Sequence, residues 1–263
     1  VCGVSPYRIM AVTFTNKAAR EMRERLLTLL GPAGLDKLTV GTFHAICARI
    51  LRREGKHIGL DPAFSIYDDE DQMSVLKRAL DEAGVDSKRH APRAVLSAIS
   101  SAKSQLIDVE EFGRRKSSYY DEIVLRVYQA YEALLAQKKA LDFDDLLAKT
   151  ARLFQATPEV LARYQDRYLH LLIDEFQDTN IAQYVLAKLV AGRWRNICVV
   201  GDPDQSIYSW RQADIRNILN FQRDYPDAKV VILEQNYRST QTILEAARGV
   251  IAANRQRKPI KLW

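Results

Sequence analysis

The chain has 263 residues, of which 47% are hydrophobic and 27% are charged, as is usual for a folded globular protein. Its 39 Lys and Arg residues exceed its 33 Asp and Glu residues, and the net charge of +6 permits a polyanionic partner without requiring one. The three dispersed cysteines argue against a disulfide framework or a zinc site, and no apolar run approaches the roughly 18–20 residues of a membrane span. With no visible signal peptide, we expect a cytoplasmic protein without a membrane partner.

The first part of the chain alternates strand and helix. Residues 9–14 form a short apolar run that predicts a buried strand, and Asn16 is a candidate cap for the helix that follows. Residues 38–40 predict a second strand, and residues 43–56 carry apolar side chains at helical spacing. Such alternation favours a parallel α/β sheet.

The middle of the chain, from about Asp68 to Tyr168, shows no convincing strand. Acidic residues at 68–71 predict a helix start, because they suit the positive end of a helix dipole, and Pro92 and Pro158 fall at helix boundaries. Helical spacing of apolar residues is clearest at one set: Ile123, Val124, Val127, Tyr128, Tyr131, Leu134 and Leu135. We therefore expect an all-helical block inside an α/β chain.

Strands return after this block. Residues 169–173, 197–200 and 230–233 are apolar runs separated by helical segments, and polar residues follow each of them. In open α/β sheets, ligands bind beyond the carboxyl ends of the strands. The sequence therefore predicts that the polar residues at 174–175, 201–202 and 234–236 converge on one edge.

The first of these polar groups ends the stretch LHLLIDEFQDTN, residues 169–180. Neighbouring carboxylates repel one another unless a cation or proton holds them. An apolar strand that ends in Asp is the Walker B arrangement, so Asp174 is the expected Mg²⁺ ligand. Glu175 is then placed to orient or deprotonate a water molecule in line with a γ-phosphorus. A pair of solvated carboxylates at a strand end is the alternative reading of this fragment.

The second group lies in CVVGDPDQSIYSWRQ, residues 198–212. Gln205 is a neutral donor that could contact a γ-phosphate. Tyr208 and Trp210, with Arg211 beside them, are suited to base stacking and backbone contact in single-stranded nucleic acid. The alternative is that these aromatic residues fill a local core.

The third group lies in LEQNYRST, residues 233–240. Arg238 could act as an arginine finger toward a γ-phosphate, and Tyr237 could stack on an adenine base. Alternatively, Arg238 is an ordinary residue near a helix N-terminus that Ser239 or Thr240 caps.

Together these motifs resemble those of the UvrD/PcrA/Rep group of superfamily 1 DNA helicases, and the resemblance covers nearly the whole chain. It rests on seven stretches: AVTFTNKAAREM (11–22), GTFHA (41–45), LDFDDLL (141–147), LLIDEFQDTN (171–180), VVGDPDQSIYSWR (199–211), LEQNYRST (233–240) and RKPIKLW (257–263). It implies an α/β, RecA-like P-loop NTPase fold with a parallel sheet and an all-helical insertion. Residues 1–60 and 138–232 would form the first RecA-like domain, 61–137 the insertion, and 233–263 the start of a second RecA-like domain.

The resemblance also implies the ligands and the residue roles. ATP and Mg²⁺ would bind at Asp174, Glu175, Gln205, Tyr237 and Arg238, with Glu175 as the catalytic base. Single-stranded DNA and single/double-strand junctions are the expected partners; protein partners are not indicated. The implied DNA contacts are Thr13, Phe14, Asn16, Thr42, His44, Tyr208, Trp210 and Arg211. The implied function is an ATP-dependent helicase or translocase in DNA repair or replication.

Two departures from the family pattern keep other functions open. The sequence has no GxxxxGK[ST] phosphate loop, which we expect upstream of Val1, and the family's later motifs would follow Trp263. Gln212 stands where the family usually has Gly. One alternative function is the helicase part of a nuclease–helicase of the AddA or RecB type, and another is a DNA-binding remnant without enzymatic activity.

Overall fold

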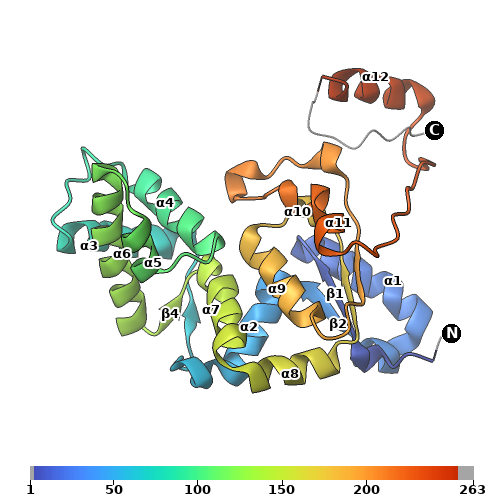
Figure 1. Ribbon diagram of the computed structural model, residues 1–263, viewed down its shortest axis with the longest axis horizontal. Coiled ribbons are helices and arrows are strands. Elements are labelled where there is room, and N and C mark those ends of the chain that lie inside the picture. Colours follow the sequence, from blue (N-terminus) through green and yellow to red (C-terminus); the bar gives the residue numbers. More distant parts are fainter. Residues whose placement is uncertain (1–2, 254–263) are drawn as a thin grey trace.

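The computed structural model describes residues 3–253, and its centre is a four-stranded parallel sheet (Figure 1). The sheet has the order β2-β1-β5-β6. Its strands are β1 (Ile9–Thr13), β2 (Thr39–Thr42), β5 (His170–Ile173) and β6 (Ile197–Val199). The four strands lie where the apolar runs of the sequence predict them, and the parallel α/β class is confirmed.

The twelve described helices are interleaved with these strands. They are α1 (Asn16–Leu35), α2 (Phe43–Glu54), α3 (Asp69–Glu82), α4 (Pro92–Ser104), α5 (Val109–Arg115), α6 (Tyr119–Gln137), α7 (Phe143–Ala156), α8 (Pro158–Arg167), α9 (Ile181–Ala191), α10 (Arg216–Leu219), α11 (Phe221–Asp224) and α12 (Gln241–Ile251). Within residues 3–253, none of them is both long enough and apolar enough to span a membrane.

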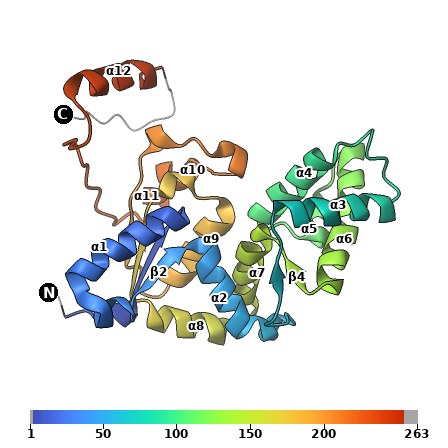
Figure 2. The same ribbon diagram turned by 180° about the vertical axis from the view of Figure 1, so that it is seen from behind.

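The two faces of the sheet are covered differently. Alternate residues of a strand point to opposite faces, so Met10 and Val12 join the main core, whereas Ala11 packs in a smaller cluster with α1. Helices α2, α7 and α9 contribute to the main core, and α1 packs on β1 and β2 (Figure 2). On the α1 face, Leu172 of β5 stays 41% exposed and Cys198 of β6 is exposed. The core face of the sheet is therefore covered more completely than the α1 face, although Ile197 and Val199 of β6 stay partly exposed.

Helix caps fix the chain where it turns away from the strands. The hydroxyl of Thr15, not Asn16 as predicted, caps α1 by accepting a hydrogen bond from the Ala18 amide at 3.0 Å. Asn16 is the first helical residue instead, because the preceding Thr15 has the extended backbone that a cap needs. Thr42 caps α2 in the same way.

Helices α3 to α6 form a separate helical block with its own hydrophobic cluster. The seven apolar residues predicted on one face of α6 are all buried, and Pro92 and Pro158 begin α4 and α8. Asp68 caps α3 through a capping box with Asp71, so the helix starts within the acidic stretch, as predicted. These features confirm the helical reading of this part of the chain.

The prediction that the middle of the chain has no strand is wrong at one position. Strand β4 (Ala140–Leu141) pairs in parallel with β3 (Ser65–Ile66), where the chain enters and leaves the helical block. A strand of two residues shows no alternation in sequence, so only the packing of the block's two ends reveals it.

The predicted strand at residues 230–233 is also wrong. This segment is coil, and its side chains are strongly exposed, from 52% for Ile232 to 76% for Leu233. Among the described residues, no strand lies beside it to satisfy its backbone groups, and an apolar run alone cannot form a ladder. The segment leads to α12, in which only Leu244 is buried. The motif at 257–263 lies outside the described residues.

Candidate active site at the carboxyl edge of the sheet

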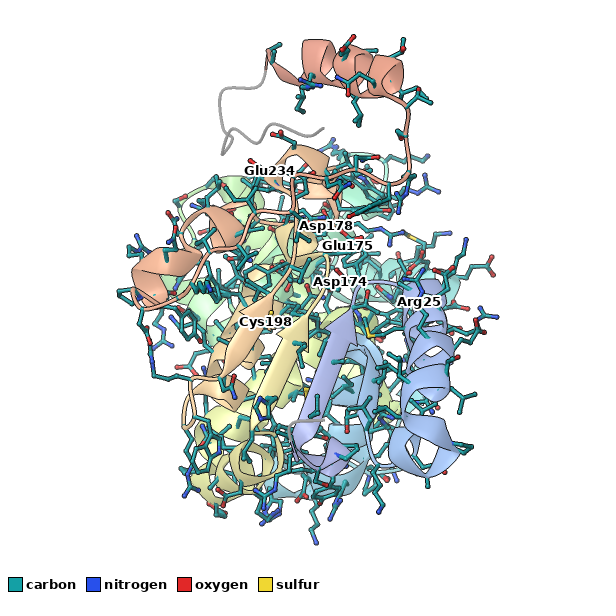
Figure 3. All side chains as sticks on the ribbon, turned by 90° about the vertical axis from the view of Figure 1, so that its right-hand side faces the viewer. Arg25, Asp174, Glu175, Asp178, Cys198 and Glu234 are labelled. Atoms are coloured by element: carbon teal, nitrogen blue, oxygen red, sulfur yellow. The ribbon has the colours of Figure 1, made fainter. Side chains whose placement is uncertain are left out.

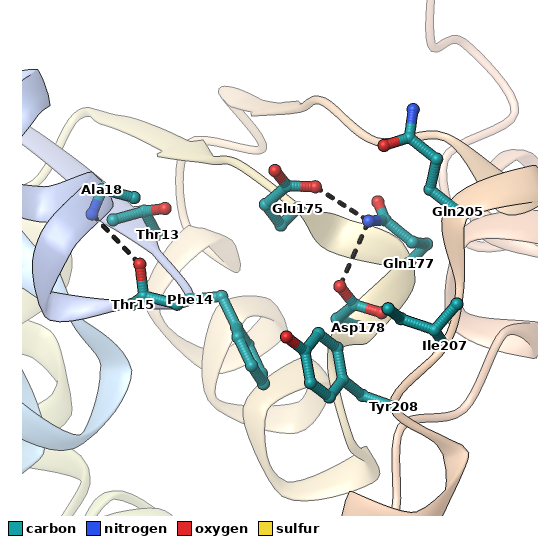
Figure 4. Close-up of a pocket in the computed structure, with 10 residues that line it drawn as sticks. All are labelled: Thr13, Phe14, Thr15, Ala18, Glu175, Gln177, Asp178, Gln205, Ile207 and Tyr208. Carbon is teal, nitrogen blue, oxygen red and sulfur yellow. Dashed lines mark hydrogen bonds between the residues drawn. The ribbon is translucent and has the colours of Figure 1, made fainter.

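A cavity of about 200 Å³ lies where β1, β5 and β6 end (Figure 4). The strands are parallel, so their carboxyl ends meet at one edge and bring together loops that are far apart in sequence. The cavity is lined by Thr13, Phe14, Thr15, Ala18, Glu175, Gln177, Asp178, Gln205, Ile207 and Tyr208. Five of these, namely Thr13, Phe14, Glu175, Gln205 and Tyr208, are residues that the sequence predicts for the site.

Asp174 and Glu175 stand at the end of β5. The Asp174 amide donates to the Val12 carbonyl at 2.9 Å, which extends the sheet pairing up to the carboxylate. Partial burial, with a smaller contribution from the Glu175 carboxylate, raises the pKa of Asp174 above its usual value. Glu175 has left-handed backbone angles, φ 52° and ψ 42°, which are unfavourable for a residue with a side chain. Such local strain is typical of functional positions.

Gln177 and Asp178 follow in the short helix η3 (Phe176–Asp178). The Gln177 side-chain amide donates to Glu175 Oε2 at 2.8 Å and to Asp178 Oδ2 at 3.2 Å. Burial and the neighbouring Glu175 carboxylate raise the pKa of Asp178 to about 6. Figure 3 shows Asp174, Glu175 and Asp178 gathered at the upper ends of the strands. The edge thus holds three neighbouring carboxyl groups, two of them with raised pKa values.

The loop after β6 faces these carboxylates. Asp202 caps η4 (Pro203–Gln205), and its carboxylate accepts hydrogen bonds from the Asp204 amide at 2.9 Å and from Gln205 Nε2 at 2.7 Å. The Asp202 amide in turn donates to Gln177 Oε1 at 3.0 Å. Gln205 is therefore held at the cavity, opposite Glu175, by the loop's own hydrogen bonds.

Aromatic rings continue from the cavity along the same loop. Phe14, after β1, lies 5.1 Å from the Tyr208 ring, and Tyr208 lies 6.1 Å from the Trp210 ring, centroid to centroid. The Arg211 guanidinium lies over Trp210 at 4.6 Å from the ring centroid. Trp210 is 68% exposed, so it does not fill a local core, whereas Tyr208 is half-buried against Phe14.

The other predicted DNA contacts lie at the same edge but differ in what their side chains do. Thr13 is 1% exposed, and its Oγ1 atom has no hydrogen-bond partner among the described residues. Asn16 is exposed, whereas Thr42 is buried and caps α2. Burial lowers the pKa of His44 to about 4, so this side chain is neutral at physiological pH and adds no positive charge to the surface.

The structure does not bring Tyr237 and Arg238 to the cavity. Tyr237 is 87% exposed, and its hydroxyl donates to Gln235 Oε1 at 2.6 Å. The Arg238 amide donates to Asn236 Oδ1 at 2.9 Å, within the turn before α12. The predicted convergence of residues 234–236 with the other two polar groups is not observed, because residues 230–233 do not pair with the sheet. The nucleotide contacts of Tyr237 and Arg238 stay predictions.

Two residues take positions that sequence reasoning missed. Gln177 is 1% exposed and links the two acidic loops; the only signal in the sequence is an amide between two acids in LIDEFQD. Gln212, which replaces the Gly usual in the resembling family, has a left-handed φ of 64°, and its Oε1 accepts from the Ser101 hydroxyl of α4 at 3.2 Å. The position favours Gly because of this backbone angle, and Gln instead adds a contact to the helical block.

The donor set at the edge fits Mg²⁺. Carboxylate oxygens are hard ligands, and Mg²⁺ bound with a nucleotide usually takes only one or two of them together with phosphate oxygens and water. Asp174 and Glu175 supply such oxygens, and a cation beside them would relieve the repulsion that helps to raise the Asp174 pKa. Within residues 3–253, no cluster of three or more His, Cys, Asp or Glu side chains has the arrangement of a self-contained metal site.

A parallel α/β sheet with an acidic pair at one strand end and a polar glutamine loop at the next is the arrangement that the motif resemblance predicts for a RecA-like domain. A family model described as the UvrD/REP helicase N-terminal domain matches residues 1–226. The chain therefore belongs to the UvrD/REP helicase family.

Several relatives are similar over almost the whole chain. The ATP-dependent DNA helicase PcrA of Bacillus subtilis (strain 168) is 53% identical over 260 residues, which are 99% of this chain and 35% of that protein. The proteins of the same name from Staphylococcus aureus (strain Mu50 / ATCC 700699) and Leuconostoc citreum are each 50% identical over 99% of this chain. The chain spans about a third of the length of these curated relatives, 35% to 36%.

Proposed function

We propose that the protein containing this chain is a cytoplasmic ATP-dependent DNA helicase that couples ATP hydrolysis to movement along single-stranded DNA and to unwinding at single/double-strand junctions, in DNA repair or replication. One observation carries the proposal. The carboxylate of Glu175, the Gln205 amide and the Phe14 and Tyr208 rings line one cavity. A hydrolytic group and a base-stacking surface at the same sheet edge are what a nucleotide-driven motor on DNA requires. The names of the PcrA relatives support the same activity.

In this proposal each residue at the edge has its own role in ATP hydrolysis. Glu175 accepts the proton of the water that attacks the γ-phosphorus, and the Gln205 amide donates to a γ-phosphate oxygen. Mg²⁺, held by Asp174, would neutralise negative charge on the phosphates. Tyr237 stacks on the adenine and Arg238 contacts the γ-phosphate, which requires their segment to move toward the cavity, since both lie away from it in this structure.

DNA would bind across the carboxyl edge mainly by stacking its bases on aromatic rings. Phe14, Tyr208 and the exposed Trp210 offer stacking faces, and Arg211 provides the positive charge beside them. Beside this surface, Asn16 offers an exposed polar group and His44 a half-buried neutral one, whereas the hydroxyls of Thr13 and Thr42 are buried. Contacts of this kind tolerate any base sequence, which suits a protein that moves along a strand.

The decisive experiment is Glu175→Gln in the full-length protein. The substitution keeps the side-chain shape and removes the base, so we expect DNA-stimulated ATP hydrolysis to fall by about 10²–10⁴-fold while ATP binding persists. Steady-state ATPase rates and nucleotide-binding measurements on the same preparation would show this division.

A matched control is Glu159→Gln, which changes an exposed glutamate at the start of α8. It is expected to leave the hydrolysis rate unchanged. Parental ATP turnover in the Glu175→Gln protein would overturn the catalytic assignment, and absence of any DNA-stimulated turnover in the parent would overturn the proposed function.

A further inference from the structure

Gln177 is a buried amide that bonds to both loops of the candidate site. Its Nε2 atom donates to the carboxylate of Glu175 at 2.8 Å, and its Oε1 atom accepts from the backbone amide of Asp202 at 3.0 Å. The side chain therefore connects the loop after β5, which carries the proposed base, with the loop after β6; Figure 4 shows its hydrogen bond to Glu175. We call this pair of hydrogen bonds the amide bridge.

The packing around Gly201 shows that the position of this amide is closely fixed. A Cβ atom on Gly201 would lie 2.5 Å from Gln177 Oε1, 2.9 Å from Ile218 Cδ1 and 3.1 Å from the Phe176 backbone nitrogen. Only a residue without a side chain lets the two loops approach so closely. Gly201 is thus needed for the amide bridge itself, and not only for a tight turn.

The amide bridge ends on the loop that carries the aromatic surface. The Asp202 carboxylate accepts a hydrogen bond from Gln205 Nε2 at 2.7 Å. Tyr208 and Trp210 lie three and five residues further along the same loop. The Ser206 hydroxyl donates back to the Gln177 carbonyl at 3.4 Å. The loop that carries the aromatic surface is therefore connected to Glu175 through one buried side chain.

We propose that Gln177 is a positioning residue that couples DNA binding at the aromatic loop to the orientation of the Glu175 carboxylate. This inference rests on the proposed function and adds to it the side chain through which DNA would stimulate hydrolysis. An amide suits this role because it can donate to a carboxylate and accept from a backbone N–H at the same time. No carboxylate or apolar side chain of similar size can do both at neutral pH.

The test is Gln177→Met in the full-length protein, which keeps side-chain length and removes the two hydrogen bonds of the amide bridge together with the one to Asp178. We expect kcat for ATP hydrolysis with saturating oligo-dT to fall about 10- to 100-fold, because a misplaced catalytic group can cost this much. The KM for ATP and the affinity for oligo-dT should change little, and the rate without DNA should fall less than the stimulated rate, so the ratio of stimulated to basal rate falls.

The matched control is Gln183→Met. Gln183 is also buried, at 4% exposed, but its Oε1 accepts from the Asn180 amide in the cap of α9 and does not touch the site. This variant should lose stability and keep the parental stimulation ratio per folded molecule. An equal loss of the ratio in both variants would show that Gln177 is merely structural.

A second variant guards against misfolding of Gln177→Met. Gly201→Ala keeps the Gln177 residue but pushes its side-chain amide out of position, and it should lower the same stimulation ratio. Its control is Gly249→Ala, which has open space around the added Cβ and should leave the ratio unchanged. Parental stimulation in both Gln177→Met and Gly201→Ala would overturn the coupling role alone. A parent protein that DNA does not stimulate would instead overturn the proposed function, and the coupling role with it.

Discussion

Two clusters of carboxylates in this molecule have opposite surroundings. One lies at the junction between the helical block and the sheet domain, where Lys103 of α4 contacts Glu132 Oε1 at 2.6 Å, Asp142 Oδ2 at 2.8 Å and Asp145 Oδ1 at 3.0 Å. The other is the site edge, with Asp174, Glu175 and Asp178. Within residues 3–253, no lysine or arginine forms an ion pair with any of these three.

Both clusters contain carboxyl groups with raised pKa values, but the junction also has ammonium groups that lower one. Burial and the neighbouring Asp145 raise the pKa of Asp142 to about 7. Burial also raises the pKa of Asp145, but the Lys103 and Lys149 ammonium groups outweigh it and hold that pKa below the usual value. Lys103 is itself fully buried, and the three carboxylates keep its pKa well above normal despite the cost of burial. At the edge, burial and the mutual repulsion of the acids raise the pKa values of Asp174 and Asp178.

The difference separates a structural cluster from a functional one. The junction contains its own cation, and the Tyr131 hydroxyl adds a hydrogen bond to Asp142 at 3.0 Å, so its charges are satisfied without a ligand. The edge concentrates negative charge beside a cavity and leaves its neutralisation to a cation from outside. We therefore expect substitutions at the junction to change stability and substitutions at the edge to change ligand binding.

The largest expected effect on stability is that of Lys103→Met. The substitution removes the cation from the buried carboxylates of Asp142 and Asp145, and only Asp145 keeps a second ammonium group, that of Lys149 at 3.4 Å. The free energy of unfolding should therefore fall by about 3–5 kcal/mol, as measured by urea denaturation. The control is Lys17→Met, whose side chain is 83% exposed and 4.0 Å from Glu21, and it should change stability by less than about 1 kcal/mol. Equal effects of the two substitutions would remove the distinction between the clusters.

The next effect is expected at the edge, in DNA affinity rather than stability. Trp210→Ala in the full-length protein should weaken binding of single-stranded DNA by about 1–3 kcal/mol, similarly for all base sequences. The salt dependence of binding should hardly change, because no phosphate contact is lost. Fluorescence titrations at several salt concentrations would measure both quantities.

Trp194→Ala is the matched control for this prediction. Trp194 is 46% exposed, and its indole donates to the Gln165 carbonyl at 2.9 Å, away from the cavity. Its loss should lower thermal stability and leave DNA affinity per folded molecule unchanged. The stacking role of Trp210 would be refuted by the same pattern in Trp210→Ala.

The smallest expected effect is a change in the pH dependence of stability. The folded-state pKa of Asp178 is raised to about 6, above the unfolded value of about 3.9, so the folded state binds more protons between these values. Asp178 therefore lowers stability progressively as pH rises from about 4 to about 6. Asp178→Asn should flatten this part of the profile of unfolding free energy against pH. The control Asp227→Asn, at an exposed side chain, should leave the profile unchanged. An unaltered slope in Asp178→Asn would contradict the raised pKa.

Much of this architecture is determined by local sequence. The apolar face of α6 and the strands at β1, β5 and β6 were predictable, because helical and extended chains place side chains at fixed periods. The parallel arrangement then brings Glu175 and Gln205 to one edge, since parallel strands end together. For the same reason the sequence predicted two of the three loops expected at the site, whereas residues 234–236 do not reach the cavity.

Other features were decided only by tertiary structure. Residues 230–233 have the composition of a strand but no neighbour to pair with, and Lys103 meets Asp142 across 39 positions of chain. From the sequence, Gln177 cannot be distinguished from a solvated amide; the hydrogen bond that it accepts from the Asp202 amide shows its role. In each case the deciding quantity is a contact between residues far apart in sequence. Periodicity fixes the face on which a side chain lies, but only packing fixes what that side chain meets.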